Sequence, residues 1–168
     1  SGANERGIQL RADGANTGQT TIFCIGNTLS DDGDAISAYN IRSNNDANLT
    51  VVSDGATVSG FMSNGLLATS FGNSTLLVGV RGGNFSAVND EGIFMEGAGT
   101  STLCAQVLNN TFDAFRIRRN AGDTGATVQL ESLPAATTVD TNTGPINDSD
   151  NVTAVNLNDC NIPATPSL

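Results

Sequence analysis

Val107-Leu108-Asn109-Asn110-Thr111-Phe112 indicates the fold of this chain, because it is one of six copies of a short pattern. Each copy has an apolar residue, a turn of small or polar residues and a second apolar residue. The copies lie 27, 29, 27, 23 and 27 residues apart, and they begin at Cys24, Val51, Val80, Val107, Leu130 and Leu157. A period of this length indicates a repeat architecture in which similar units stack.

A second set of apolar residues, which we call the second register, repeats with a similar spacing. An isoleucine or leucine precedes each of the first five copies by 13 to 16 residues, at Ile8, Ile36, Leu66, Ile93 and Ile117. Apolar residues also alternate along the chain, as at Leu76, Val78 and Val80, which is the period of a β-strand. No segment has the amphipathic pattern of a helix over three turns. We therefore predict an all-β parallel solenoid of about six coils, forming a single domain over residues 4–163.

Three phrases carry a family resemblance: Gly7-Ile8-Gln9-Leu10, Asn89-Asp90-Glu91-Gly92-Ile93 and the quoted stretch at 107–112. They resemble the right-handed parallel β-helix repeat of pectate-lyase-like proteins and of bacterial surface proteins such as autotransporter passengers. The resemblance covers roughly residues 4–163 and implies a right-handed parallel β-helix. It does not single out a function, because lyases, hydrolases, adhesins and phage tail proteins share this repeat.

The resemblance also implies an asparagine ladder at one corner of the coils. Asn109 or Asn110 would stack there with Asn27, and the ladder would be broken where Gly83 and Asp54 stand at the equivalent corners.

The ends of the chain are expected to lie outside the repeat. Ser1-Gly2-Ala3 is typical of a cloning remnant, and residues 164–168 of an extended tail. The sequence contains no run of about 18 apolar residues and no signal-peptide pattern, so we expect no membrane insertion. We expect a piece of a longer extracellular or cell-surface protein.

The charge is strongly one-sided. The net charge is −10, with seven basic residues that are all arginine, and histidine is absent. Such a surface disfavours nucleic acid, which rewards Lys and Arg, and it favours solubility or cationic partners. The absence of histidine also excludes Ser-His-Asp and Cys-His catalysis within this chain.

The three cysteines are expected to form no internal disulfide. Cys104 falls in the fourth predicted coil and Cys160 in the sixth, so at about 4.8 Å per coil the two would lie about 10 Å apart. A disulfide needs Cα atoms within about 7 Å. Cys24 falls on an inward position and is predicted to be a small core residue.

Acidic residues are frequent in the turns that directly precede two of the repeated isoleucines, Ile36 and Ile93. If these turns stack, carboxylates of neighbouring coils would meet on one edge and could hold calcium, which takes oxygen ligands. The competing interpretation is that Asp, Asn and Gly simply suit tight turns. The candidate calcium ligands are Asp32, Asp34, Asp90 and Glu91.

The arginines of the fifth predicted coil suggest a second kind of site. Arg116 and Arg118 alternate around Ile117, so they would share an outer face that could bind an anionic sugar. If the protein is an enzyme, Arg116, Arg118 and Asp90 are the candidate catalytic residues. The competing interpretation is an exposed strand whose arginines balance nearby Asp113 and Asp123.

The leading functional interpretation is a non-catalytic surface or secreted solenoid that acts as an adhesin or a structural stalk. Its expected partner is a polysaccharide or another host or cell-surface ligand, and exposed coil ends favour self-association. The turn-rich stretches Ser37 to Asn48 and Pro134 to Asp150 are the predicted recognition loops. The alternatives are a polysaccharide lyase or glycoside hydrolase of pectate-lyase-like type, and a segment of a phage tail spike. The absence of Trp weakens the enzyme alternative.

Overall fold

The computed structural model describes residues 6–14, 18–131, 146–148 and 151–167, and every regular element in them is a strand. The strands are β1 (Arg6–Asp13), β2 (Thr20–Ile25), β3 (Thr28–Ser30), β4 (Ser37–Asn44), β5 (Asn48–Asp54), β6 (Thr57–Phe61), β7 (Asn64–Ser70), β8 (Thr75–Arg81), β9 (Asn84–Ala87), β10 (Ile93–Gly97), β11 (Thr102–Leu108), β12 (Thr111–Phe112), β13 (Phe115–Arg119), β14 (Thr127–Glu131), β15 (Ile146–Asp148) and β16 (Thr153–Val155).

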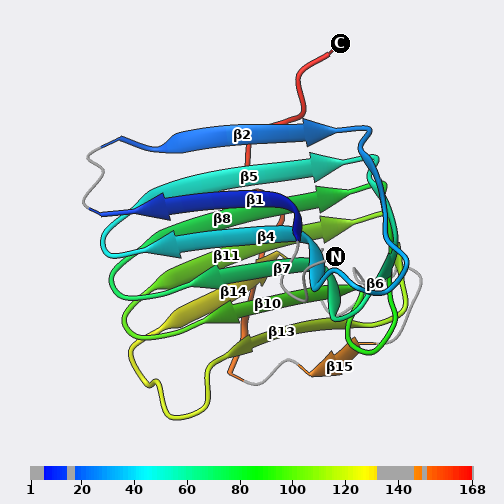
Figure 1. The fold of residues 1–168 in the computed structure, drawn as a ribbon. Coiled ribbons are helices and arrows are strands. Elements are labelled where there is room, and N and C mark those ends of the chain that lie inside the picture. Colours follow the sequence, from blue (N-terminus) through cyan, green and yellow to red (C-terminus); the bar gives the residue numbers. More distant parts are fainter. Residues whose placement is uncertain (1–5, 15–17, 132–145, 149–150, 168) are drawn as a thin grey trace.

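These strands form a parallel β-solenoid of about five turns (Figure 1). In the described residues, each of the first four turns contributes a strand to three sheets in order. Sheet A has the strand order β1-β4-β7-β10-β13-β15, sheet B the order β2-β5-β8-β11-β14-β16, and sheet C the order β3-β6-β9-β12. The all-β solenoid predicted from the repeat is confirmed. The count of about six coils is corrected, because the last predicted copy, at residues 157–162, lies outside the coils.

The core is a set of columns in which equivalent residues of successive coils stack. In sheet B, one column runs through Ile22, Val51, Val78, Ala105 and Leu130. The alternation therefore assigned the inward positions of this sheet correctly, and Leu76, Val78 and Val80 are fully buried. Cys24 is also buried in the core, as predicted.

The second register is correct at three of its five positions. Ile8, Leu66 and Ile93 stack in one inward column of sheet A. In the other two coils, Tyr39 and Phe115 occupy the column in place of the predicted Ile36 and Ile117. Ile117 still faces the core, in the next column beside Met95.

The predicted recognition loop Ser37 to Asn48 is wrong, because most of it is strand β4. Tyr39 and Ile41 point into the core and are fully buried, so the stretch alternates like its neighbours despite its polar composition. The other predicted loop, Pro134 to Asp150, lies almost wholly outside the described residues, as do residues 1–3.

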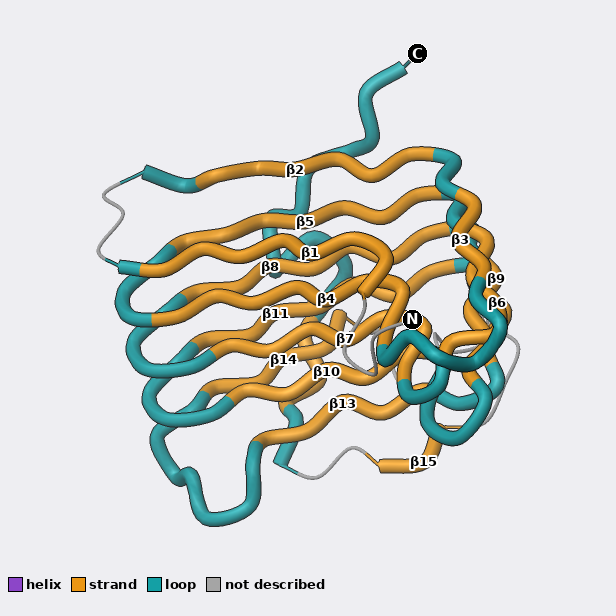
Figure 2. Tube along the Cα trace, viewed as in Figure 1, coloured by secondary structure: helices purple, strands orange, loops and turns teal. Residues whose placement is uncertain are grey.

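The corner between sheets B and C repeats from coil to coil (Figure 2). Gly26, Gly55, Gly82 and Asn109 follow the strands of sheet B, and all have positive φ, from 56° to 66°. This conformation suits Gly and Asn. The next residues are Asn27, Ala56, Gly83 and Asn110. The predicted asparagine ladder therefore contains Asn27 and Asn110. It is interrupted at Gly83, as expected, and at Ala56, where Asp54 was expected to interrupt it.

Candidate functional site

The end of the chain crosses the outer face of sheet B. After β16, residues 156–167, which we call the strap, leave the coils and run back across the strands (Figure 1). The amide of Cys160 donates to Oε1 of Glu131 in β14 at 2.8 Å. Further along, Nη1 of Arg81 in β8 donates to the carbonyl of Pro163 at 3.1 Å, and Thr165 donates to Asp54 in β5.

A disulfide joins the strap to the sheet. Cys160 is bonded to Cys104 of β11, and their Cα atoms lie 5.6 Å apart. The prediction of no internal disulfide is therefore wrong. It placed Cys160 inside a stacked coil, two rungs away from Cys104. In the structure Cys104 belongs to the outward register of β11, and the strap brings Cys160 back over it.

An apolar contact and a polar network also hold the strap. Val52, Cys104, Cys160 and Ile162 are buried together between sheet and strap. Ile162 lies over Gly79, where an added Cβ would come within 2.9 Å of its Cγ2 atom. Because the strap covers this part of sheet B, apolar side chains lie on both faces of the sheet there.

The polar network runs along the strap's edge. Glu131, only 3% exposed, accepts from the side chain of Gln106 at 2.5 Å as well as from the strap. Gln106 in turn accepts from Nε of Arg81 at 2.6 Å. A buried carboxylate is costly unless it is hydrogen-bonded, so removing the strap would leave this network under-satisfied.

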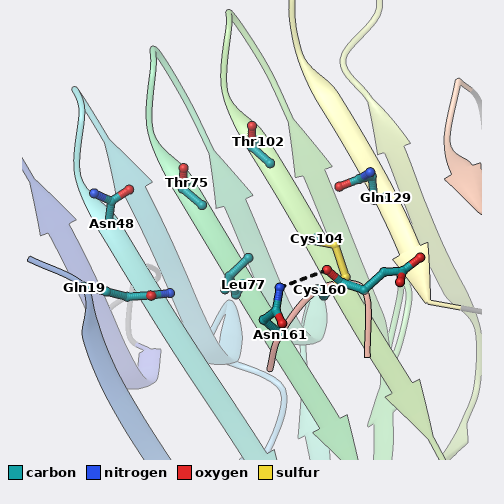
Figure 3. A pocket seen from close by; sticks show the side chains of 10 residues that line it. Gln19, Asn48, Thr75, Leu77, Thr102, Cys104, Gln129, Cys160 and Asn161 are labelled. Atoms are coloured by element: carbon teal, nitrogen blue, oxygen red, sulfur yellow. Dashed lines mark hydrogen bonds between the residues drawn. A yellow bond between two sulfur atoms is a disulfide. The ribbon is translucent and has the colours of Figure 1, made fainter. Parts of the chain in front are cut away.

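An open groove of about 540 Å³ lies beside the strap on the outer face of sheet B (Figure 3). Polar side chains of successive coils line its floor, and Asn48, Thr75 and Thr102 form one lateral row. Gln19 and Gln129 add amide groups, and Asp159 and Asn161 of the strap form the opposite wall. We call this the strap groove.

The chemistry of the strap groove is that of recognition by hydrogen bonds. Its amides and hydroxyls can both donate and accept, which suits the hydroxyl groups of a ligand. Two of its amides also bind within the protein, since Nε2 of Gln19 donates to Thr50 and Nδ2 of Asn161 donates to the carbonyl of Asp159. Its carboxylate, Asp159, is already engaged, since Oδ2 accepts from the amide of Asn156 at 2.8 Å. Regularly spaced coils present these groups about 4.8 Å apart, so a ligand with repeating units can contact several rungs.

The turns that carry the acidic residues lie on one edge of the solenoid, and a turn without a carboxylate, at Met62 to Gly65, stacks between them. The amides of Met62 and Ser63 donate to Ala35 and Ile36 of the preceding coil, and the amides of Val88 and Asn89 donate to Phe61 and Met62 in the same way. Asp32, Asp34 and Asp90 are exposed in these turns, whereas Glu91 is buried.

The acidic side chains of these turns have separate partners. Asp31 caps its own turn, since Oδ2 accepts from the amides of Gly33 at 3.0 Å and Ala35 at 2.7 Å. The bond from Ala35 contributes most to lowering the pKa of this carboxyl group. Asp90 accepts from Ser63 at 2.9 Å, and Glu91 pairs with Arg116. In the described part of the chain, no three potential metal-ligating side chains converge.

The two candidate arginines lie on the outer face of sheet A, around the buried Ile117, as predicted. Nη1 of Arg116 lies 3.3 Å from Oε1 of Glu91. Nε of Arg118 donates to Oε2 of Glu96 at 2.7 Å. Both guanidinium groups thus neutralise carboxylates of the preceding coil, which corrects the expected pairing with Asp113 and Asp123. Asp113 instead accepts from the amide of Ala87 at 2.9 Å.

Sequence reasoning did not find the strap groove. Its signal is in the strands themselves: Val52 and Leu77 are apolar at outward positions, where an uncovered sheet would carry polar residues. Such positions indicate that a segment packs on the outer face.

No protein-family model, curated protein or solved structure matches this chain. The likeness to pectate-lyase-like proteins and autotransporter passengers therefore stands as a resemblance in the repeat alone, and function must be argued from the surfaces of the solenoid. No helix long and apolar enough to cross a membrane occurs in the described residues.

Proposed function

We propose that this protein is a non-catalytic surface or secreted β-solenoid that binds a polysaccharide through the strap groove, as an adhesin or an adhesive section of a stalk. The observation that carries the proposal is the groove itself, where a row of hydroxyl and amide groups on successive coils faces a strap fixed by a disulfide. A rigid scaffold with regularly spaced polar groups suits a ligand with regularly spaced hydroxyls.

The disulfide also supports the proposed location. Disulfides persist in oxidising compartments and are rare in the cytosol. The Cys104–Cys160 bond therefore favours an extracellular or cell-surface protein. The net charge of −10 favours a ligand other than nucleic acid.

The non-catalytic reading is supported by the partners of the candidate catalytic groups. Arg116 and Arg118 are engaged with Glu91 and Glu96, and Asp90 accepts from Ser63. A general base or acid needs a free site beside the reacting group, and these contacts are those of groups that hold neighbouring coils together.

The test is retention of the protein on a panel of neutral and acidic polysaccharides, with and without calcium, together with the chain length of each polysaccharide. We expect retention without shortening. The variant Thr75→Ala/Thr102→Ala should weaken retention about fivefold or more, since each lost hydrogen bond contributes about 0.5–1.5 kcal/mol. The matched control is Thr28→Ala/Thr57→Ala, a laterally paired couple on sheet C.

The alternatives give different results in the same assay. Shortened chains would contradict the non-catalytic proposal and direct attention to Arg116, Arg118 and Asp90. Retention that depends on calcium would indicate that the acidic turns bind calcium and take part in binding the polysaccharide. A trimer in light scattering would favour the tail-spike alternative. Equal retention of both double variants would show that the strap groove is not the binding surface.

A further inference from the structure

A second cavity, of about 300 Å³, lies on the outer face of sheet A, well away in the fold from the strap groove. Three arginines line it, Arg6 and Arg11 from β1 and Arg42 from β4. No Asp or Glu is among the described residues that line it. On a protein with a net charge of −10, this is a local concentration of positive charge.

Two of these arginines are direct lateral neighbours, because Arg11 pairs with Arg42 in the register of β1 and β4. Like charges directly opposite each other in a sheet are destabilising unless something neutralises them. Asp13 neutralises Arg11, to which it is bonded, and its other oxygen accepts from Asn44 at 2.8 Å. Among the described residues, Arg42 forms no ion pair, and its charge is attracted to Asp13 at longer range.

The side chain of Arg42 packs on an aromatic ring. Its guanidinium carbon lies 4.8 Å from the centroid of the Phe71 ring. Its Nε atom is buried and has no hydrogen-bond partner among the described residues. A buried N–H of a charged group without an acceptor is costly, so this atom marks a position where an acceptor is missing.

Sheet A contains a second arginine that stacks on a phenylalanine, and this arginine has a carboxylate partner. Arg118 also stacks on a phenylalanine, with its guanidinium carbon 5.2 Å from the centroid of the Phe94 ring. There Nε has its acceptor, since it donates to Glu96 at 2.7 Å. Glu96, on the preceding coil, is the lateral neighbour of Arg118. The lateral neighbours of Arg42 are Arg11 on the preceding coil and Thr69 on the following coil, and neither is a carboxylate. The Arg42 stack therefore lacks the carboxylate that the Arg118 stack has.

We propose that the Arg42 cavity binds the carboxylate of an acidic sugar, which takes the place that Glu96 takes beside Arg118. Guanidinium groups bind carboxylates strongly because both are planar and their charges are opposite. The amides of Gln9 and Asn40 line the cavity and suit sugar hydroxyls, and Leu67 and Phe71 offer apolar walls. Its volume of about 300 Å³ lies at the lower end of the range for small-molecule pockets, so the expected ligand is small.

The test is titration of the ¹⁵N-labelled protein with sodium glucuronate at fixed ionic strength. The signals are the Nε–H resonance of Arg42 and the side-chain amide resonances of Gln9 and Asn40, which remain in the Arg42 variant. We expect a saturable shift with glucuronate and none with glucose. Arg42→Gln should weaken binding about tenfold or more, as expected for the loss of a charge-assisted hydrogen bond.

A second pair of variants keeps the test valid if Arg42→Gln fails to fold. Thr69→Glu supplies the missing carboxylate within the chain and should abolish glucuronate binding, while Thr69→Gln adds a similar volume without charge and should retain it. The proposal is overturned if Thr69→Glu binds glucuronate like the wild type, or if glucose binds equally well. It is also overturned if a Glu-Glu dipeptide binds more tightly, because the cavity would then fit a protein partner.

Discussion

The side chain of Asn110 binds to the backbone of the preceding coil at Gly83. Oδ1 of Asn110 accepts from the amide of Gly83 at 2.9 Å, and Nδ2 donates to the carbonyl of Val80 at 2.8 Å. Asn110 is 1% exposed. One buried amide side chain therefore satisfies a donor and an acceptor that the corner would otherwise leave without partners.

We expect Asn110→Ala to destabilise the protein by about 2–4 kcal/mol, because two buried backbone groups lose their partners at about 1–3 kcal/mol each and part of the loss is recovered by water. Urea denaturation measures this change. Asn84→Ala, an exposed position in the adjoining strand β9, is the control and should change stability by less than about 0.5 kcal/mol. Equal effects of the two variants would contradict the structural role of Asn110.

The disulfide between the strap and sheet B is expected to stabilise the protein. Cys104 and Cys160 are 56 residues apart, so in the chain-entropy account their bond should contribute about 4 kcal/mol. We expect Cys104→Ser/Cys160→Ser to melt at a lower temperature than the wild type. A reductant should lower the melting temperature of the wild type and leave that of the double variant unchanged.

The third cysteine provides the control for this prediction. Cys24 is free and is buried in the core, whereas the strap lies on the outer face of sheet B. Cys24→Ala should remain sensitive to reductant like the wild type. A wild-type protein whose melting is the same with and without reductant would show that the strap is not fixed by the disulfide in solution.

The fold could be predicted from the sequence because the signal is repeated in every coil. Leu76, Val78 and Val80 recur as equivalent inward residues in neighbouring strands, and stacking them requires a solenoid. The strap could not be predicted in this way. Its residues Leu157 to Ile162 match the short repeat pattern and its spacing, yet they pack on the outside, because Val52 and Leu77 need a cover.

The candidate sites were predicted less well for a related reason. Alternation shows that Arg116 and Arg118 point outward, but it does not show which side chain of the next coil each one meets. That depends on lateral register, which sets Glu96 beside Arg118 and Thr69 beside Arg42. A shift of a few residues in the coil alignment, as between Ile36 and Tyr39, changes all such pairs.

Gly60 gives a prediction about close approach between coils. It has φ 80°, and an added Cβ would lie 1.9 Å from the carbonyl oxygen of Asp31. Gly60→Ala must therefore move the backbone, at a cost of about 1–3 kcal/mol for overpacking in addition to about 1–2 kcal/mol for positive φ. Gly14→Ala is the matched control, since Gly14 has φ 85° and open space.

Gly14→Ala should thus show only the cost of the backbone conformation, and thermal melting of both variants measures the difference. If Gly60→Ala were no less stable than Gly14→Ala, the close contact between Gly60 and Asp31 would not exist in solution.

Asp31 makes the stability depend on pH. The amide of Ala35 and then that of Gly33 donate to its carboxylate, and these bonds lower the pKa of the folded protein below the ordinary Asp value. The unfolded chain therefore binds more protons than the folded one in the acid range, so stability rises with pH there. The stabilisation is present above the unfolded pKa of about 3.9 and is lost as the pH falls through the lowered folded value.

The variant Asp31→Asn isolates this effect, because it keeps a side-chain oxygen for the turn and removes the charge. We expect it to melt at a lower temperature than the wild type at pH 7, and the two melting temperatures to converge as the pH falls through the lowered pKa of Asp31 in the folded protein. Asp34→Asn, an exposed position in the same turn, is the control and should follow the wild type across the range. A difference between Asp31→Asn and the wild type that stayed constant with pH would show that the charge of Asp31 does not stabilise the turn.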